Sequence, residues 1–491
     1  MTHIKQLAGQ TAIYGISSIL GRLLNYLLVP IYTRIFEPAQ YGVVTEFYAY
    51  VTFLLVIYTY GMETAYFRFS NNPNQPEEKI FNNSLFSLLI SSFLFSGILI
   101  LFSQSIASAI GYPSNGEYIV WFAVILAADA ITSIPFGRLR RQNKVKKFAS
   151  IKIFTIVLNV IFNIFFLVLC PYFVKSGSTV AINLIYNPEI GVGYVFISNL
   201  LSSVITLFML WKEFSQFKPR IDFILWKELI VYSLPLLIAG FAGMINETLD
   251  RILIKHLLPA SANPLEQLGI YGANYKLAIF MTLFIQAFRY AAEPFFFAQA
   301  ENKDKDKVYA EVMNYFIFAG SVIYIGVVIY LNAIKYLIGE EYHSGLHVVP
   351  ILLLANLFLG IYFNLTIWFK ISNKTSWGAV IAIIGAIITI VLNILLIPAL
   401  GYLGAAWTTL ACYVIMTILA YLLGQKYYPI KYNVSRGIFY ILVAVIIVIA
   451  KQATEIYFQL NEIALMTGGT LLLLLFIAGG YLLETAKKSV S

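Results

Sequence analysis

The sequence predicts an all-α polytopic membrane protein of about fourteen transmembrane helices, with two related six-helix lobes followed by two further helices. Three observations support this prediction: an excess of apolar residues, a regular succession of long apolar segments, and an alternation of basic residues between those segments. Hydrophobic residues make up 60% of the 491 residues and charged residues only 12%. A soluble domain carries about 25% charged residues, so this chain has too few to cover a surface that faces water.

Apolar segments recur along the whole chain at lengths that match the thickness of a bilayer. A helix needs about 20 apolar residues to cross a hydrocarbon core of about 30 Å. The chain contains a succession of such segments, separated by short polar connections. The predicted spans lie near residues 11–36, 41–67, 80–110, 117–136, 148–174, 191–211, 228–254, 268–298, 308–334, 348–369, 377–398, 402–424, 436–451 and 463–483.

Basic residues fall mainly in every second connection between the predicted spans. Most of the 33 lysines and arginines belong to this set, and the richest connection runs from Arg138 to Lys147. Because connections rich in Lys and Arg stay in the cytoplasm, we expect both termini to be cytoplasmic and the protein to lie in the cytoplasmic (inner) membrane. The net charge of +9 then reflects loops beside an anionic leaflet, so nucleic acid is not an expected partner.

The connections are too short to form a separate catalytic or ATP-binding domain. The longest on the expected external side, near 171–190 and 335–347, still form no domain-sized segment. The sequence also contains no P-loop motif. We therefore expect a protein that is not an enzyme and uses no cofactor or metal. Energy for transport would come from an Na⁺ or H⁺ gradient, the membrane potential or downstream consumption of the cargo.

Short similarities recur in the same order in the two halves of the chain, at a separation of about 230 residues. Each match is weak alone, but their common order indicates an internal duplication. The matches are Tyr41-Gly42 with Tyr271-Gly272, Asn143-Lys144 with Asn373-Lys374, Thr155–Asn159 with Thr389–Asn393, and Gly191–Gly193 with Gly401–Gly404.

The duplication predicts three parts. Residues 1–222 form an N-lobe of six spans, and residues 223–430 form a C-lobe of six spans. Residues 431–491 add spans thirteen and fourteen outside the pseudosymmetric core. Each copy has an even number of spans, so both begin on the same side of the membrane. Parallel repeats of this kind occur in transporters whose halves rock around a central site.

Arg22 lies near the middle of the first predicted span. A guanidinium at that depth costs about 2.5–3.5 kcal/mol on insertion scales, so we expect it to face a wet cavity or an anionic partner. Tyr14, Ser18 and Asn25 fall on the same helical face as Arg22. No carboxylate on the same helix is within reach of Arg22, which favours a cavity.

Similar polar stripes mark the second, seventh and eighth spans. Together with the first span, these are the first two spans of each repeat. Four matching helices with polar faces are what the walls of a central cavity require. Arginine and lysine suit a phosphate, and amides suit sugar hydroxyls. The candidate substrate-binding residues are Arg22, Asn25, Arg68, Arg251, Lys276, Gln286 and Arg289.

Structural explanations for several of these residues stay open on sequence alone. Arg251 follows Glu247 by four residues, a spacing at which the two side chains pair on a helix. Arg68 and Lys276 can anchor helix ends in the membrane interface. Arg289 can pair with the glutamate four residues after it.

Acidic residues in or beside the apolar segments are candidates for ion coupling. Asp129 lies within the fourth span, where it either pairs with a neighbouring helix or binds a coupling cation. Glu63, Glu247 and Asp250 complete this group of candidates.

Several motifs resemble those of Wzx-type polysaccharide flippases of the MATE/MOP transporter superfamily, which also contains the lipid II flippase MurJ. The resemblance covers essentially the whole chain and is strongest before residue 70. The matching segments are Leu7–Gly15, Gly21-Arg22, Pro30–Arg34, Gln40–Gly42, Tyr60–Ala65 and the basic turn Arg141–Ala149.

The resemblance implies a two-lobed flippase that moves an undecaprenyl-diphosphate-linked oligosaccharide across the cytoplasmic membrane by alternating access, for O-antigen (lipopolysaccharide), capsule or exopolysaccharide biosynthesis. It implies that cavity arginines bind the diphosphate. Arg22 corresponds to one of them by motif, while Arg68 and Arg289 correspond only by helix. Spans thirteen and fourteen would resemble a groove for the lipid tail. Membrane lipids and the polysaccharide polymerase machinery are the other implied partners.

Two alternatives within the superfamily remain, a cation-coupled MATE-type exporter and a lipid II flippase. An exporter predicts about twelve spans and an acidic or aromatic cavity, in contrast to the basic first span. A polytopic glycosyltransferase or polymerase is less favoured, because it would need catalytic residues on a long external loop.

Overall fold

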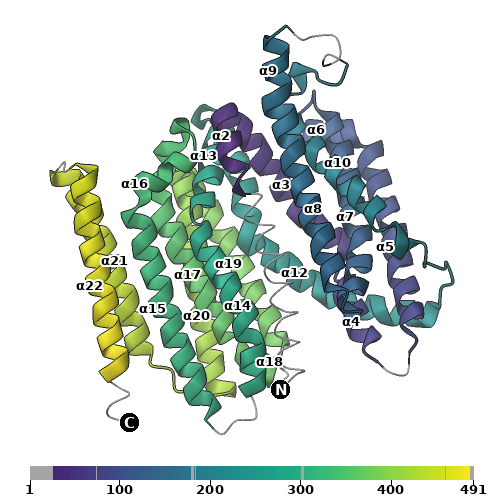
Figure 1. The fold of residues 1–491 in the computed structure, drawn as a ribbon. Helices are drawn as coiled ribbons and strands as arrows, with labels where there is room; N and C mark the ends of the chain where they lie inside the picture. The colour runs from purple at the N-terminus through teal and green to yellow at the C-terminus, as the bar shows by residue number, and fades with distance from the viewer. Residues whose placement is uncertain are drawn as a thin grey trace. The chain divides into compact units, whose positions relative to one another are not determined.

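The computed structural model describes residues 26–72, 75–177, 182, 184–299, 304–372, 374–458 and 461–486. Within these ranges the chain forms helices and no strands (Figure 1). This confirms the prediction of an all-α fold. The helices divide into two compact units. Among the described residues, unit 1 holds those from 26 to 244 except 37–42, and unit 2 holds 37–42 and those from 245 to 486.

Unit 1 is built from helices at the second to sixth predicted spans, together with the end of the first span and the start of the seventh. A π-helical turn at Phe165–Leu169 joins α8 to α9, so these two helices form one long span. The helices are α2 (Val29–Ile35), α3 (Pro38–Thr59, from residue 43 onward), α4 (Met62–Ser70), α5 (Glu77–Leu101), α6 (Ser103–Ala109), α7 (Gly116–Arg141), α8 (Val145–Ile164), α9 (Cys170–Lys175), α10 (Gly193–Met209), α11 (Trp211–Phe214) and the first part of α12 (Phe223–Leu257).

Unit 2 contains the later spans and the start of α3. Short 3₁₀ turns at Ala260–Ala262, Lys335–Leu337 and Glu340–Val348 connect its helices. The helices are the last part of α12, α13 (Pro264–Leu277), α14 (Ile279–Gln299), α15 (Lys305–Ile329), α16 (Leu331–Ile334), α17 (Val349–Leu365), α18 (Ile367–Ile371), α19 (Ser376–Leu400), α20 (Tyr402–Tyr427), α21 (Val434–Phe458) and α22 (Glu462–Ala486).

The helices confirm a multi-pass membrane protein. Among the described residues, 11 helices are long and apolar enough to span a bilayer, and there are 12 if a bent pair counts as one span. This pair, α13 and α14, bends by 49° and lies at the eighth predicted span. The sixth predicted span corresponds to the shorter apolar helix Gly193–Met209. Most of the first predicted span lies outside the described residues, so the count of fourteen stays a prediction. The lobe boundaries at 222 and 430 also stay predictions.

The core of unit 1 is largely aromatic. Phe47 stacks on Phe122 with ring centroids 5.5 Å apart, and Phe122 contacts Phe196 at 4.7 Å. Met62, Tyr66 and other buried side chains of α4 pack in a second cluster with residues of α5 and α7. This second cluster fixes α4, which carries the candidate residues Glu63 and Arg68.

The second span is broken between α3 and α4. Tyr60 and Gly61 adopt positive φ angles of 33° and 77°, which interrupt the helix for two residues. A β-carbon at position 61 would lie only 2.8 Å from the β-carbon of Leu236. Glycine therefore satisfies both the left-handed backbone and the close approach of α12.

In unit 2 the first turn of α3 packs closely on α13. A β-carbon on Gly42 would overlap the carbonyl oxygen of Leu265, and one on Gly269 would overlap that of Pro38. Small residues permit such close approach between membrane helices. The Tyr41-Gly42 motif noted in the sequence therefore has a packing role in this unit.

The last two helices, α21 and α22, pack against α15 and against each other (Figure 1). Glu484 of α22 accepts hydrogen bonds from Arg436 at 3.1 Å and from Tyr440 at 2.8 Å, both on α21. Near the opposite ends of these helices, Glu455 of α21 accepts a hydrogen bond from Asn332 of α16 at 2.9 Å. Polar contacts thus fix the pair at both ends.

Candidate functional site

Arg22 and Asn25, two residues of the predicted substrate site, lie outside the described residues. Their proposed role in binding therefore stays a prediction. The other candidates lie on α4, α7, α12, α13 and α14, and each can be placed within its own unit.

Arg68 of unit 1 stacks on an aromatic ring. It lies in the last turn of α4, and its guanidinium carbon is 4.4 Å from the centroid of the Tyr232 ring on α12. The Arg68 side chain is exposed, and among the described residues no carboxylate lies within 4 Å of it. A guanidinium on a ring face keeps its edge N–H groups available to an anion.

Arg289 of unit 2 has the same kind of environment. Its guanidinium carbon on α14 lies 4.0 Å from the centroid of the Phe363 ring on α17. The residue is exposed, and in the part of the chain that the structure describes it forms no ion pair. The side chain of the glutamate at position 293 is not among those described, so the predicted pairing of these two residues stays open.

Arg251, in contrast, is held by several protein groups. Its Nη1 atom lies 3.6 Å from Oδ1 of Asp250 and donates a hydrogen bond of 2.7 Å to the carbonyl oxygen of Glu247. Its guanidinium also stacks on Tyr275, and Tyr271 donates a 2.5 Å hydrogen bond to Oδ2 of Asp250. The ion-pair partner of Arg251 is therefore the adjacent Asp250, and the charge of Glu247 also acts on Arg251.

The remaining candidates of unit 2 differ in exposure. Glu247 is exposed on α12, whereas Lys276 at the end of α13 and Gln286 on α14 are partly buried. Both Lys276 and Gln286 make further contacts within the protein. Their predicted contacts with substrate remain predictions.

Glu63 lies at the start of α4 and pairs with Arg140 of α7. At the same end of α7, Arg138 and Arg141 both pair with Glu77 of α5, at 3.3 Å and 3.4 Å. These ion pairs connect α4 and α5 to the basic end of α7. A coupling role for Glu63 would therefore require its pair with Arg140 to open.

Asp129 on α7 has a polar environment made by other helices. Ser203 of α10 donates a hydrogen bond of 2.9 Å to Oδ1 of Asp129. Lys152 of α8 interacts with Asp129 electrostatically, and its amino group also lies 4.1 Å from the centroid of the Phe136 ring. Sequence analysis did not single out Lys152, because it belongs to a basic cluster that membrane topology explains.

Glu46 is a buried carboxylate that was not a candidate from sequence. It is 0% exposed on α3 and accepts hydrogen bonds from Tyr50 at 3.0 Å and Tyr112 at 2.5 Å. Burial raises the pKa of Tyr112, and the nearby carboxylate of Glu46 raises it further, so this hydroxyl remains a donor. The signal in the sequence was an acidic residue within the predicted span 41–67, with a tyrosine four residues later.

Each unit thus presents one arginine that is stacked on an aromatic ring and has no acidic partner among the described residues. Both arginines lie on membrane-spanning helices. A guanidinium held flat on a ring has lost conformational freedom but retains its donors, which match the oxygens of a phosphate in pairs. Such arginines are suited to anion binding and supply no nucleophile.

Comparison with solved structures identifies the fold as that of MOP superfamily transporters. The structure titled "Lipid II flippase MurJ, inward closed conformation" aligns with a TM-score of 0.73 at 14% identity, covering 96% of this chain and 99% of that chain. An inward-facing multidrug resistance MATE family transporter aligns with a TM-score of 0.64 at 12% identity, covering 83% of this chain and 94% of that chain. The MATE multidrug transporter DinF-BH aligns with a TM-score of 0.58 at 14% identity, covering 86% of this chain and 95% of that chain.

The sequence itself assigns the family. Residues 7–299 match the family described as "Polysaccharide biosynthesis protein". The chain therefore belongs to this family of membrane proteins, as its resemblance to polysaccharide flippases led us to expect. No curated protein matches the chain in sequence.

Proposed function

We propose that this protein is a flippase that moves a polyprenyl-diphosphate-linked oligosaccharide from the cytoplasmic to the outer leaflet of the inner membrane, by alternating access and without chemical conversion. The observation that carries the proposal is the presence of Arg68 and Arg289 on membrane-spanning helices, each stacked on a ring and without an acidic partner in the described chain. The family supplies the link to polysaccharide synthesis.

The cargo explains why such arginines would be retained within a membrane. An isolated ion in a low-dielectric medium faces an idealised penalty of tens of kcal/mol, so a diphosphate does not cross hydrocarbon unaided. Arginine side chains can replace part of its hydration with paired hydrogen bonds. A protein that exports cations would instead have carboxylates, or aromatic rings without a stacked arginine, at the positions of Arg68 and Arg289.

The orientation and energy source form part of the proposal. The distribution of basic residues supports cytoplasmic termini, which would place the ion-paired end of α7 on the cytoplasmic side. An Na⁺ or H⁺ gradient, with Asp129 as the coupling candidate, is one energy source. Consumption of the cargo by a polymerase in the outer leaflet is another.

The proposal is tested by the location of the lipid-linked intermediate. In a strain that lacks the gene, radiolabelled lipid-linked oligosaccharide should accumulate on the cytoplasmic leaflet and surface polysaccharide should disappear. A plasmid copy of the full chain should reverse both effects. An equal sensitivity to hydrophobic cations in the two strains would separate this function from drug export.

The opposite pattern would refute the proposal. Normal surface polysaccharide combined with increased sensitivity to cationic drugs would indicate a MATE-type exporter. Loss of viability that is rescued only by a lipid II flippase would instead indicate lipid II as the cargo.

A further inference from the structure

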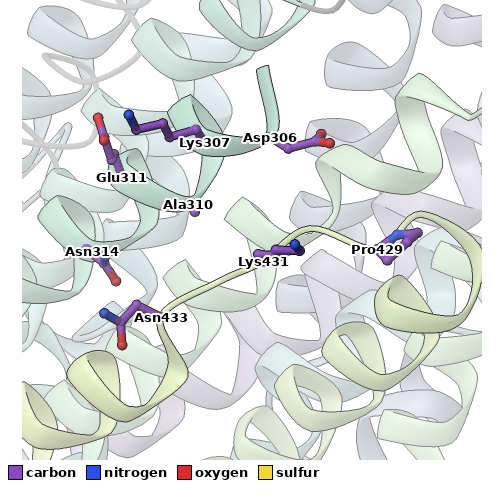
Figure 2. Close-up of a pocket in the computed structure, with 8 residues that line it drawn as sticks. All are labelled: Asp306, Lys307, Ala310, Glu311, Asn314, Pro429, Lys431 and Asn433. Carbon is purple, nitrogen blue, oxygen red and sulfur yellow. The ribbon is translucent and has the colours of Figure 1, made fainter. Parts of the chain in front are cut away.

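A pocket of about 300 Å³ opens in unit 2 where α15 begins and where residues 428–433 connect α20 to α21 (Figure 2). Its side chains come from α15 and from this connection and surround one common space. The polar lining residues are Asp306, Lys307, Glu311, Asn314, Lys431 and Asn433.

Asn314 distinguishes this pocket from an ordinary charged surface. It is only 4% exposed, yet its side-chain amide forms no hydrogen bond with any residue that the structure describes. The amide atoms of Asn314 are not among the fully buried side-chain atoms that lack a partner, so they face the accessible space of the pocket and not a dry interior. The Asn314 amide lines the pocket and can both donate to and accept from a ligand there.

The charged lining residues are also without ion-pair partners. Within the described ranges, no ion pair of 4 Å or less involves Asp306, Lys307, Glu311 or Lys431. Two positive and two negative groups therefore surround the pocket and balance each other. A ligand that carries one charge of each sign fits such a lining better than an ion of a single sign.

The pocket lies at the level where the helices leave the apolar layer. The spans of α15 and α21 begin at Lys305 and Val434, and the span of α20 ends at Tyr427. Tyr432 lies in the connection beside the pocket, and burial, together with the charge of Asp306, raises its pKa. Tyrosines are enriched at this depth, where lipid headgroups reside.

We propose that this pocket binds the phosphoethanolamine headgroup of a bilayer phospholipid. The phosphate would lie against Lys307 and Lys431, and the primary ammonium would donate hydrogen bonds to Asp306 and Glu311. The Asn314 amide would complete the set of contacts. This site is separate from Arg68 and Arg289 and does not depend on the identity of the transported cargo.

The lining discriminates between common headgroups. A phosphoglycerol headgroup is anionic and would add one negative charge that the balanced lining does not compensate. A phosphocholine headgroup has the correct charges, but its quaternary ammonium has no N–H group to donate to a carboxylate. Phosphoethanolamine satisfies both sets of protein groups.

The test is lipid binding by the full-length protein purified in detergent, measured by native mass spectrometry with added phosphatidylethanolamine, phosphatidylcholine or phosphatidylglycerol. The wild-type protein should retain phosphatidylethanolamine preferentially. Glu311→Gln and Lys431→Gln should each weaken this binding about tenfold, which corresponds to the loss of about 1.4 kcal/mol. Glu341→Gln, an exposed acidic position outside the pocket, is the matched control and should bind as the wild type does.

Asn314→Leu provides a second arm, with melting temperature and size-exclusion profile as checks of folding. It should weaken the binding of phosphatidylethanolamine, because the amide contact to the headgroup is lost. Because Lys431 is exposed on a connection, Lys431→Gln keeps the test decisive even if Asn314→Leu does not fold. Equal or tighter binding of phosphatidylglycerol by the wild type, or unchanged binding by the Gln variants, would overturn the proposal.

Discussion

In each of the two units, one arginine of a membrane helix forms an ion pair and another stacks on an aromatic ring. In unit 1, Arg140 pairs with Glu63, while Arg68 stacks on Tyr232. In unit 2, Arg251 pairs with Asp250, while Arg289 stacks on Phe363. The difference within each unit separates arginines that stabilise the helix bundle from arginines whose donors remain available. The variants below test this separation, from the largest expected effect to the smallest.

Arg251→Ala should destabilise the protein most. It removes the ion-pair partner of Asp250, whose side chain is 5% exposed. Breaking one side of a buried pair costs about 3–5 kcal/mol, because it leaves an uncompensated charge. The thermal unfolding midpoint of the purified protein should fall strongly and should recover in the double variant Asp250→Asn, Arg251→Ala. An unchanged midpoint in the single variant would place Arg251 among the binding arginines instead.

Arg68→Ala and Arg289→Ala should have the opposite signature. Each should reduce transport of the lipid-linked cargo about 10- to 100-fold, since a hydrogen bond to a charged group contributes about 1.5–3 kcal/mol. Their thermal midpoints should stay close to that of the wild type. Arg220→Ala, in the exposed connection before α12, is the matched control. Wild-type rates of surface polysaccharide assembly in both variants would remove these arginines from the substrate site.

Asp129 and Lys152 test charge compensation within unit 1. Lys152→Met removes a cation that interacts electrostatically with Asp129 and should lower stability by about 1 kcal/mol or less, because Lys152 is exposed and its charge is screened. The double variant Asp129→Asn, Lys152→Met should recover much of the loss. If Asp129→Asn alone abolishes the ion dependence of transport, whereas Lys152→Met leaves transport unchanged, Asp129 binds the coupling ion directly.

Glu63→Gln should have the smallest effect. The side chains of Arg140 and Glu63 are 36% and 38% exposed, and ion pairs with such exposure contribute about 0–1 kcal/mol. The expected outcome is a shift in melting temperature of a few degrees or less, with transport retained. A severe loss of transport at normal stability would show that Glu63 acts in coupling and not only in holding α4 to α7.

The sequence predicted the positions of the spans well because each span is a local property of about 20 residues. It could not predict tertiary partners. Arg140 finds Glu63 across 77 residues of chain, and no helical periodicity encodes that contact. The spacing left a pair of Arg251 with Glu247 open, and only the structure shows the ion pair of Arg251 with the adjacent Asp250. Lys152 was overlooked because topology already explained its basic neighbours.

The role of Asn314 could not be predicted from sequence either, because it depends on tertiary neighbours. In the sequence it is one polar residue near the start of an apolar helix, and only the connection after α20 turns it into part of a pocket. Arg289 could be proposed from sequence because a cation within an apolar run is a local anomaly, whereas Arg68 was proposed only from its helix in the family resemblance. The rings beneath them, on α12 and α17, required the fold.

Gly61 sets a limit on how this protein can evolve. Its φ of 77° excludes side chains that avoid the left-handed region, and the proximity of Leu236 excludes bulk. Neither constraint involves the sugar that is carried. Adaptation to a new cargo can therefore alter the residues that contact it, while a larger side chain at position 61 stays excluded.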